Sequence, residues 1–301
     1  MRAHRAPFAV LAVALLLLPG CTSAGAPSPR PASAAIRFAA YDFSENQILV
    51  AVYAEGARRA GLPVTVQSGV ATREVVEPAL EQGVVDVVID YLGTAVSFVR
   101  GTTVAAPKGP QQLHALLSSL MVGRGVSVLD AARAQDQNGF AVTTAFAAAH
   151  RIDRLSQLGA VASRLTFGGP AECPERPFCL PGLRRAYGAN FRVVRTMPSR
   201  SATVEALLSG QIQVGMLETT DARLSLESVL LLQDDRSLQP NENVVPLVRT
   251  ATITRWGERL RTALDAVSAR LTTADLVRLN KAVEVDRRTP AEAAAQWWAG
   301  N

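Results

Sequence analysis

Two segments, Ala79–Tyr91 (ALEQGVVDVVIDY) and Ala206–Glu218 (ALLSGQIQVGMLE), follow one pattern. Each begins as the end of a helix, passes through a glycine and continues as an apolar run, which is typical of a buried parallel strand. When Gly83 is aligned with Gly210, Tyr91 falls on Glu218. Ligands of open α/β sheets bind beyond the carboxyl ends of the strands. The pattern therefore predicts two lobes that present Tyr91 and Glu218 from opposite walls of a cleft.

The rest of the chain alternates short apolar runs with amphipathic stretches, beginning with a strand at Ile36. This alternation indicates an α/β protein with mostly parallel sheets. Two local predictions accompany it. Ser44 and Gln47 are spaced as a capping box that starts a helix, and Asp90–Thr94 is expected to be a polar loop.

The chain has 301 residues, of which 48% are hydrophobic, and this is enough for two well-buried lobes. The formal net charge is +5, and the basic residues are arginines except Lys108 and Lys281. These basic residues are scattered and are not interleaved with aromatic residues, so we do not expect nucleic-acid binding. Aromatic residues make up only 5% of the chain, which makes each one in a loop a candidate for function.

The N-terminal segment is typical of a secretory leader. Arg2 and Arg5 precede an apolar stretch, Phe8–Leu18, that is too short to span a bilayer comfortably. Leu18-Pro19-Gly20-Cys21 follows and is similar to the lipobox of bacterial lipoproteins. We expect residues 1–20 to be a lipoprotein signal peptide, Cys21 to be lipid-modified and residues 21–35 to be a flexible tether. The alternative is an ordinary secretory signal with an incidental cysteine.

Cys173 and Cys179 enclose a short loop that contains Arg176 and two prolines. A disulfide is allowed outside the cytoplasm, and closing this loop would constrain the unfolded chain by about 2 kcal/mol. It would also hold Arg176 in place, and a fixed guanidinium suits a carboxylate or phosphate. The alternative is a structural staple beside a solvated arginine. Two cysteines alone are a poor zinc signal, and we expect no metal.

Several motifs together carry a resemblance to a known family. They are Phe43–Leu49, Ala79–Gly83 with Asp90–Thr94, Asp136–Phe140, Gly182-Leu183 with Tyr187-Gly188, Thr219–Asp221, Leu238–Pro240 and Asn243–Pro246. They resemble the substrate-binding proteins of ABC importers for glycine betaine, choline, carnitine and related osmoprotectants. The cysteine loop, with Glu172-Cys173-Pro174 and Arg176–Cys179, is similar to that of one branch of this family.

The resemblance implies a two-lobed periplasmic-binding-protein fold of type II, in which two crossover segments join lobes that close on a ligand between them. We expect lobe I at 36–133 with 243–301, and lobe II at 134–242. It also implies an extracytoplasmic monomer, anchored by lipid to the outer face of the cytoplasmic membrane. The expected partners are a small quaternary-ammonium solute and the transmembrane subunits of a permease, without a cofactor.

The resemblance also implies ligand contacts. Tyr91 and Thr94 match the tyrosine and threonine of the family's first lobe, and Phe140 falls where the family usually has a tyrosine. Arg176 falls near the family's carboxylate-binding arginine. Glu218 falls where the family usually has an aromatic residue of the cage around the ammonium group. Asn241 and Glu242 lie where another tyrosine often occurs, and Tyr41 lies where the family often has a lysine. The remaining candidate contacts are Asp136, Asn138 and Thr219.

A quaternary ammonium has no N–H group, so aromatic faces bind it through cation–π contacts. A carboxylate at Glu218 would favour a cation without its own carboxylate, such as choline, a polyamine or a basic amino-acid derivative. Two other classes stay open. An enzyme is disfavoured because the chain has no G-x-S-x-G or H-E-x-x-H motif. A sensor could use the same fold without transport.

Overall fold

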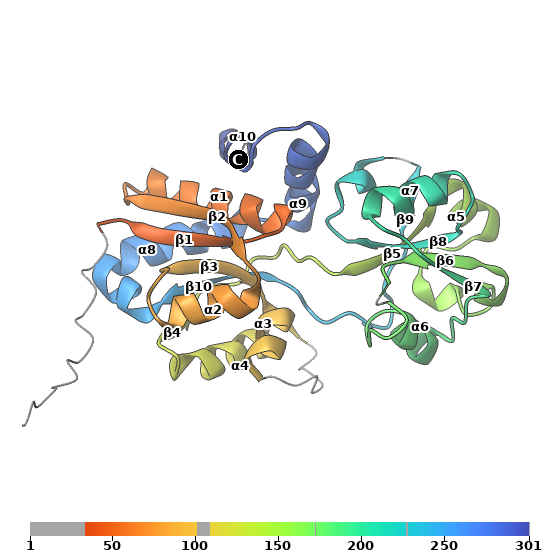
Figure 1. Cartoon of the computed structure of the whole chain (residues 1–301), viewed down its shortest axis with the longest axis horizontal. Coiled ribbons are helices and arrows are strands. Elements are labelled where there is room, and N and C mark those ends of the chain that lie inside the picture. The colour runs from red at the N-terminus through yellow and green to blue at the C-terminus, as the bar shows by residue number, and fades with distance from the viewer. Residues whose placement is uncertain (1–33, 101–108, 172, 227, 301) are drawn as a thin grey trace, which may run out of the picture. The chain divides into compact units, whose positions relative to one another are not determined.

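The computed structural model describes residues 34–100, 109–171, 173–226 and 228–300. The expected signal peptide, the lipidation site at Cys21 and nearly all of the expected tether lie outside these residues. The described chain forms two five-stranded sheets, each covered by helices on both faces (Figure 1). It therefore has the predicted α/β class.

The first sheet has the strand order β2-β1-β3-β10-β4. Strand β1 pairs in parallel with β2 and β3, whereas β10 is antiparallel to both β3 and β4. The strands are β1 (Ile36–Tyr41), β2 (Val64–Ala71), β3 (Val87–Tyr91), β4 (Val126–Val128) and β10 (Val244–Arg249).

Alternate side chains of β1 point into two different hydrophobic cores, as the pleat of a strand requires. Phe38 packs with one set of helices and Ala39 with the other. The first set is α1 (Ser44–Arg59), α8 (Thr250–Arg270), α9 (Thr273–Asn280) with the π-helical turn η4 (Lys281–Val285), and α10 (Pro290–Ala299). The second set is α2 (Arg73–Glu81), α3 (Leu92–Arg100) and α4 (Pro110–Val122).

The second sheet has the strand order β7-β6-β8-β5-β9 and the same arrangement of directions. Strand β6 is parallel to β7 and β8, and β5 is antiparallel to β8 and β9. The strands are β5 (Asn138–Thr143), β6 (Thr166–Gly169), β7 (Val193–Thr196), β8 (Val214–Glu218) and β9 (Val229–Leu231). The helices are α5 (Thr144–His150), α6 (Leu180–Tyr187), α7 (Arg200–Leu208) and the 3₁₀ turns η1 (Leu155–Gln157), η2 (Ala162–Arg164) and η3 (Ala222–Ser225).

Strands β3 and β8 occupy the same central place in the two sheets, which confirms the predicted equivalence. Gly83 and Gly210 both have positive φ, at 70° and 74°, a conformation that favours glycine. Tyr91 and Glu218 are the last residues of their strands. Each faces the start of the antiparallel neighbour, Tyr91 opposite Val244 and Glu218 opposite Asn138.

The prediction of mostly parallel sheets needs one correction, because both sheets are mixed. Strands β10 and β5 run antiparallel to their neighbours. Each is the first strand that the chain forms after it crosses from the other sheet. The two connecting segments meet at an antiparallel bridge between Gln135 and Asn243. A hinge motion between the sheets would have to bend the chain near this bridge.

Two local predictions were wrong. The segment after Asp90 is not a polar loop, because helix α3 begins directly at Leu92. Helix α1 begins at Ser44 as expected, but its N-cap is Phe43 and no side chain caps it. The last helix, α10, begins at Pro290 with Thr289 as its N-cap, and Glu292 completes a capping box there.

Candidate functional site

A cleft of about 740 Å³ lies among loops and helix ends of both sheets. Its walls include the carboxyl end of β3, the amino end of β5, the cysteine loop and the amino end of α7. The loop before α1 and the junction of α9 with η4 complete it. The residues that line the cleft include Phe43, Glu45, Tyr91, Thr94, Asp136, Asn138, Arg176, Phe178, Arg200, Glu218, Thr220, Asp221, Glu242, Asn280 and Glu284.

Aromatic side chains line this cleft from two sides. Phe43 is 41% exposed and stacks on the buried Tyr91, with ring centroids 6.4 Å apart and an interplanar angle of 26°. Phe178, on the cysteine loop, is 42% exposed and also lines the cleft. Exposed aromatic faces at a concave site suit a cationic group that cannot donate hydrogen bonds.

Two carboxylates, the buried Glu45 and the half-buried Asp136, lie close to Tyr91. The Tyr91 hydroxyl donates to Glu45 Oε1 at 2.6 Å, and burial together with Glu45 raises the pKa of Tyr91 well above its usual value. Asp136 Oδ1 accepts a hydrogen bond of 2.9 Å from the Thr220 hydroxyl. Burial, and then the neighbouring Glu45, raise the pKa of Asp136 well above its usual range. A cation placed here would stabilise the ionised form of Asp136.

Glu242 adds a third carboxylate to the same wall. Its Oε2 accepts from the Thr94 amide and its Oε1 from the Thr94 hydroxyl, both at 2.9 Å. Burial raises the pKa of Glu242 to about 7, although these two hydrogen bonds oppose the shift. Among the described residues that line the cleft, carboxylates outnumber arginines.

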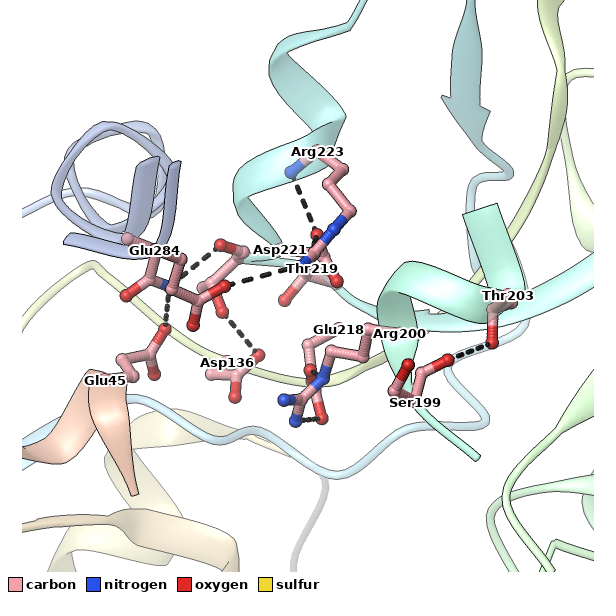
Figure 2. A network of polar contacts seen from close by, with 12 residues as sticks. Glu45, Asp136, Ser199, Arg200, Thr203, Glu218, Thr219, Asp221, Arg223 and Glu284 are labelled. Carbon is pink, nitrogen blue, oxygen red and sulfur yellow. Dashed lines mark hydrogen bonds and ion pairs between the residues drawn. The ribbon is translucent and has the colours of Figure 1, made fainter. Parts of the chain in front are cut away.

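The opposite wall, which belongs to the second sheet, is rich in arginine. Cys173 and Cys179 form a disulfide, with their Cα atoms 5.3 Å apart, and this bond closes the loop that carries Arg176. Arg200, at the start of α7, forms an ion pair with Glu218 (Figure 2). Glu218 is therefore already compensated by a cation of the protein, unlike the carboxylates beside Tyr91.

Polar contacts join the two sides of the cleft. Asn280 Nδ2 donates to Glu45 Oε2 at 2.7 Å and to the Thr220 carbonyl at 2.9 Å. Arg223 lies 3.1 Å from Asp221 and 3.6 Å from Glu284 in two ion pairs. These contacts connect α1, α9 and η4 of the first sheet's layer to η3 beside the second sheet (Figure 2).

Six predicted site residues line the cleft: Tyr91, Thr94, Asp136, Asn138, Arg176 and Glu218. Thr219 lies beside it, where its hydroxyl accepts from the Gln137 amide at 2.9 Å. The structure does not place the other two at the cleft. Phe140 is buried farther along β5 against Phe167. Tyr41 is buried, and its hydroxyl donates to Glu77 at 3.0 Å and Asp90 at 2.9 Å.

Sequence reasoning missed several residues of the cleft, namely Phe43, Glu45, Phe178, Asn280 and Glu284. The scarcity of aromatic residues was a usable signal for Phe43 and Phe178, since both fall in loops. No local pattern marks Asn280 or Glu284, which reach the site only because the C-terminal helices pack against α1.

Two features are absent from the residues that the structure describes, a cluster of metal ligands and a membrane-spanning helix. No group of three or more His, Cys, Asp and Glu side chains in this part of the chain could hold a metal ion. Within the same residues, every helix is too short or too polar to cross a membrane.

The fold and the cleft agree with comparisons to known proteins. The family model OpuAC, described as the substrate-binding domain of ABC-type glycine betaine transport systems, matches residues 34–300. A glycine-betaine-binding protein of Pseudomonas aeruginosa is 26% identical over 273 residues, which cover 87% of this chain and 86% of that protein.

A second relative and a solved structure extend the comparison. An ergothioneine transport permease and binding protein of Helicobacter pylori, EgtU, is 26% identical over 141 residues, 47% of this chain and 25% of that protein. The crystal structure of a glycine betaine/carnitine/choline ABC transporter superimposes with a TM-score of 0.80 at 19% identity. This superposition covers 88% of this chain and 98% of that one, and it supports the two-lobed fold.

Proposed function

This chain belongs to the family of substrate-binding domains of ABC-type glycine betaine transport systems, and we propose that it captures a quaternary-ammonium solute and delivers it to a membrane permease. Glycine betaine, choline and related osmoprotectants are the ligands that we propose first. The lobes would meet at residues 133/134 and 242/243 and close on the solute by bending near the Gln135–Asn243 bridge.

One observation supports this proposal most strongly. The faces of Phe43 and Tyr91 lie beside the carboxylates of Glu45 and Asp136. Glu45 accepts hydrogen bonds from Tyr91 and Asn280, and Asp136 accepts one from Thr220, so the donors in these hydrogen bonds are uncharged. Aromatic faces attract a permanent cation by about 0.5–2 kcal/mol each. Nearby carboxylates add an attraction that does not require N–H donors on the ligand.

The same carboxylates support a second candidate function. A polyamine or a basic amino-acid derivative would also neutralise Glu45, Asp136 and Glu242, and its N–H groups would donate to them. In that case the protein would be a binding component for another small cation. We propose binding without catalysis in both cases.

The test is isothermal titration calorimetry on the purified protein with glycine betaine, choline, carnitine, proline betaine, ergothioneine and spermidine. Saturable binding of at least one quaternary-ammonium compound, with no turnover of the ligand, is the expected result. Binding of spermidine alone would favour the second candidate. Absence of binding across the panel would contradict both candidates. If the protein with its bound ligand did not stimulate transport by the neighbouring permease, a sensor would be favoured.

We also propose that a lipid on Cys21 anchors the protein outside the cytoplasmic membrane. The leader composition and the position of the cysteine after a short apolar stretch support this. Cell fractionation tests it with the substitution Cys21→Ser, which should move the protein from the membrane fraction to the soluble extracytoplasmic fraction. An unchanged membrane association of this variant would contradict the anchor.

A further inference from the structure

Four polar side chains form a network behind the aromatic wall of the cleft. Tyr41 ends β1, Asp90 lies next to the end of β3, and Arg73 and Glu77 lie one turn apart on α2. Tyr41, Glu77 and Asp90 are buried, whereas Arg73 reaches the cleft and lines it. A charge that is buried in this way is costly unless a partner balances it.

An arginine balances the first acid of this network. Asp90 accepts two hydrogen bonds from the Arg73 guanidinium, one from Nε to Oδ2 at 2.9 Å and one from Nη2 to Oδ1 at 2.5 Å. Its Oδ1 also accepts from the Tyr91 amide at 2.8 Å. A two-point contact with a guanidinium suits an ionised carboxylate, so Asp90 is the charged acid of the network.

The second acid, Glu77, lacks such a balance. The Tyr41 hydroxyl lies 3.0 Å from Glu77 Oε1 and 2.9 Å from Asp90 Oδ2, but a phenol has one proton and donates it to one acceptor at a time. Glu77 Oε2 is buried and has no hydrogen-bond partner among the residues that the structure describes. An ionised Glu77 would therefore compete with Asp90 for a single donor.

One proton on Glu77 removes this competition. Glu77 Oε1 then donates to the Tyr41 oxygen, and the Tyr41 proton goes to Asp90, whose charge the Arg73 guanidinium balances. Each contact of the network then joins a donor to an acceptor. Burial, and then the charge of Asp90, raise the pKa of Glu77 to about 8, which agrees with a neutral acid at neutral pH.

Charged and titratable groups reach Glu77 from its own helix and from neighbouring strands. The strand β2 has no charged residue, and Arg249 of β10 lies against Gly83, beyond the end of α2. The groups that act on the network are Arg73 and Glu81 of α2, Tyr41 of β1, Asp90 of β3 and, beside Asp90, Glu242 before β10. Arg73 is the one cation of this set, and both of its hydrogen bonds in the network go to Asp90.

The network also holds both ends of the aromatic wall. The Tyr41 ring stacks on Phe43 with centroids 6.1 Å apart and an interplanar angle of 17°, and Phe43 stacks in turn on Tyr91. The Tyr91 amide donates to Asp90. The Arg73 guanidinium lies 4.8 Å from the centroid of the Tyr41 ring. The exposed Phe43 ring therefore stacks on two buried rings that the network holds in place.

From these contacts we propose that Glu77 is a positioning residue for the site of the ammonium group. As a neutral acid it donates to Tyr41, and the Tyr41 proton then belongs to Asp90. This arrangement fixes the Tyr41 ring on which Phe43 stacks. Loss of the Glu77 proton would leave two carboxylates beside one hydroxyl, and the aromatic wall would loosen. The proposal rests on the function proposed above, because it concerns the same ligand.

The pH profile of choline affinity, measured by calorimetry, tests the role of the proton. Wild type and Glu77→Gln should agree within about twofold at about pH 7, because the glutamine amide can also donate to Tyr41. Between about pH 7 and 9.5 the wild type should lose about fivefold relative to this variant, since Glu77 ionises and the amide cannot. Parallel profiles, or a relative gain by the wild type, would overturn the proposal.

Glu81→Gln is the matched control, one turn farther along α2. Glu81 pairs with Arg124 at 2.7 Å, and it lines neither the cleft nor the cavity of about 600 Å³ that adjoins the cleft beside the second sheet. This variant should follow the wild-type profile. A profile that changed as much as that of Glu77→Gln would contradict Glu77 as the group that titrates.

Glu77→Leu separates positioning from the filling of space. It keeps a side chain of similar size but leaves the buried Tyr41 oxygen without a donor, so choline binding at about pH 7 should weaken about fivefold. Thermal unfolding verifies that each variant folds. Equal affinities of the leucine and glutamine variants would show a role in packing alone and would overturn the proposal.

Infrared spectroscopy tests the proton without any ligand. At about pH 7 the wild type should show the carbonyl band of one more protonated carboxyl group than Glu77→Gln. Absence of this difference would overturn the proposal whatever ligand binds. Absence of choline and glycine betaine binding to the wild type would instead contradict the proposed function, and the role of Glu77 at that site with it.

Discussion

Strands β3 and β8 have the same place in their sheets, the same glycine before them and the same antiparallel neighbour, yet they end in opposite chemistry. Tyr91 ends β3, and its hydroxyl donates a hydrogen bond to the buried Glu45. Glu218 ends β8 and pairs with Arg200 at the surface of the cleft. Two equivalent strands therefore end at different walls, one with aromatic rings beside Glu45 and Asp136, and one whose acid, Glu218, is paired with Arg200.

From this difference we propose that the ammonium of a zwitterionic ligand lies at the Tyr91 wall and its carboxylate at the Arg176 and Arg200 wall. The ion pair with Arg200 bears on the expectation from sequence that Glu218 selects a cation, which stays a prediction. The substitutions below test the assignment of the two walls.

Removing the aromatic face of the first wall should have the largest effect. We expect Tyr91→Ala to weaken binding of any quaternary-ammonium ligand by about 30-fold, equivalent to a desolvated cation–π contact of about 2 kcal/mol. Tyr91→Phe keeps the face and should stay within about threefold of the wild type. Calorimetry measures both, after thermal unfolding has shown that they fold. Wild-type affinity of the alanine variant would remove Tyr91 from the site.

On the second wall, the effect of the corresponding substitution should depend on which ligand is bound. Arg176→Ala should weaken binding of betaines by about tenfold, or 1.4 kcal/mol, and leave choline within about twofold, because only betaines carry a carboxylate. Arg185→Ala is the control, since Arg185 is exposed on α6 and lines neither cavity. Equal losses for choline and betaine would contradict the assignment of the carboxylate to this wall.

The pH dependence of affinity should report the carboxylates of the first wall. The pKa of Asp136 is raised, and that of Glu242 is raised to about 7. A bound cation favours their ionised forms, so affinity for choline should rise about fivefold as pH increases from about 5.5 to 8. Glu242→Gln should flatten this profile, and calorimetry across the pH range measures it. Affinity that fell with rising pH would contradict a cation at this wall.

Ligand affinity should rise with pH, whereas the free energy of unfolding of the ligand-free protein should fall as pH rises. A carboxyl whose folded pKa is raised binds a proton more tightly in the folded state than in the unfolded state. For Glu242 this stabilisation is present below the unfolded value, near 4.5, and is lost as pH rises through about 7. Chemical denaturation of wild type and Glu242→Gln should show a smaller loss in the variant over this range. An equal loss in both would contradict the raised pKa of Glu242.

The smallest effect should come from the acid of the second wall. Glu218→Gln leaves Arg200 without its anion, so we expect it to improve betaine binding by about threefold and to change choline binding less. Comparison of the two ligands by calorimetry measures the difference. A large loss of choline affinity in this variant would restore Glu218 as the residue that selects the cation.

The strand-end positions could be predicted from sequence because they depend on local features. A helix end, a glycine and then an apolar run locate β3 and β8 without any knowledge of packing. The direction of β10 and β5 could not be predicted in this way. The direction depends on how the chain crosses between the sheets. The sequences of β10 and β5 are those of ordinary buried strands and do not indicate it.

The composition of the site was only partly predictable, for a similar physical reason. Phe140 and Tyr41 are aromatic residues near strand ends, but packing against Phe167 buries the first and hydrogen bonds to Glu77 and Asp90 hold the second. Asn280 reaches the cleft through the packing of the C-terminal helices, from a position 235 residues beyond the Glu45 that it contacts.

A crystal structure of the protein with its tightest-binding betaine would show which wall holds the ammonium group and which holds the carboxylate. We predict the trimethylammonium group against the rings of Phe43 and Tyr91, and the carboxylate within hydrogen-bond distance of Arg176 or Arg200. The reverse orientation, with the ammonium beside Glu218 and the carboxylate near Glu45 and Asp136, would contradict it.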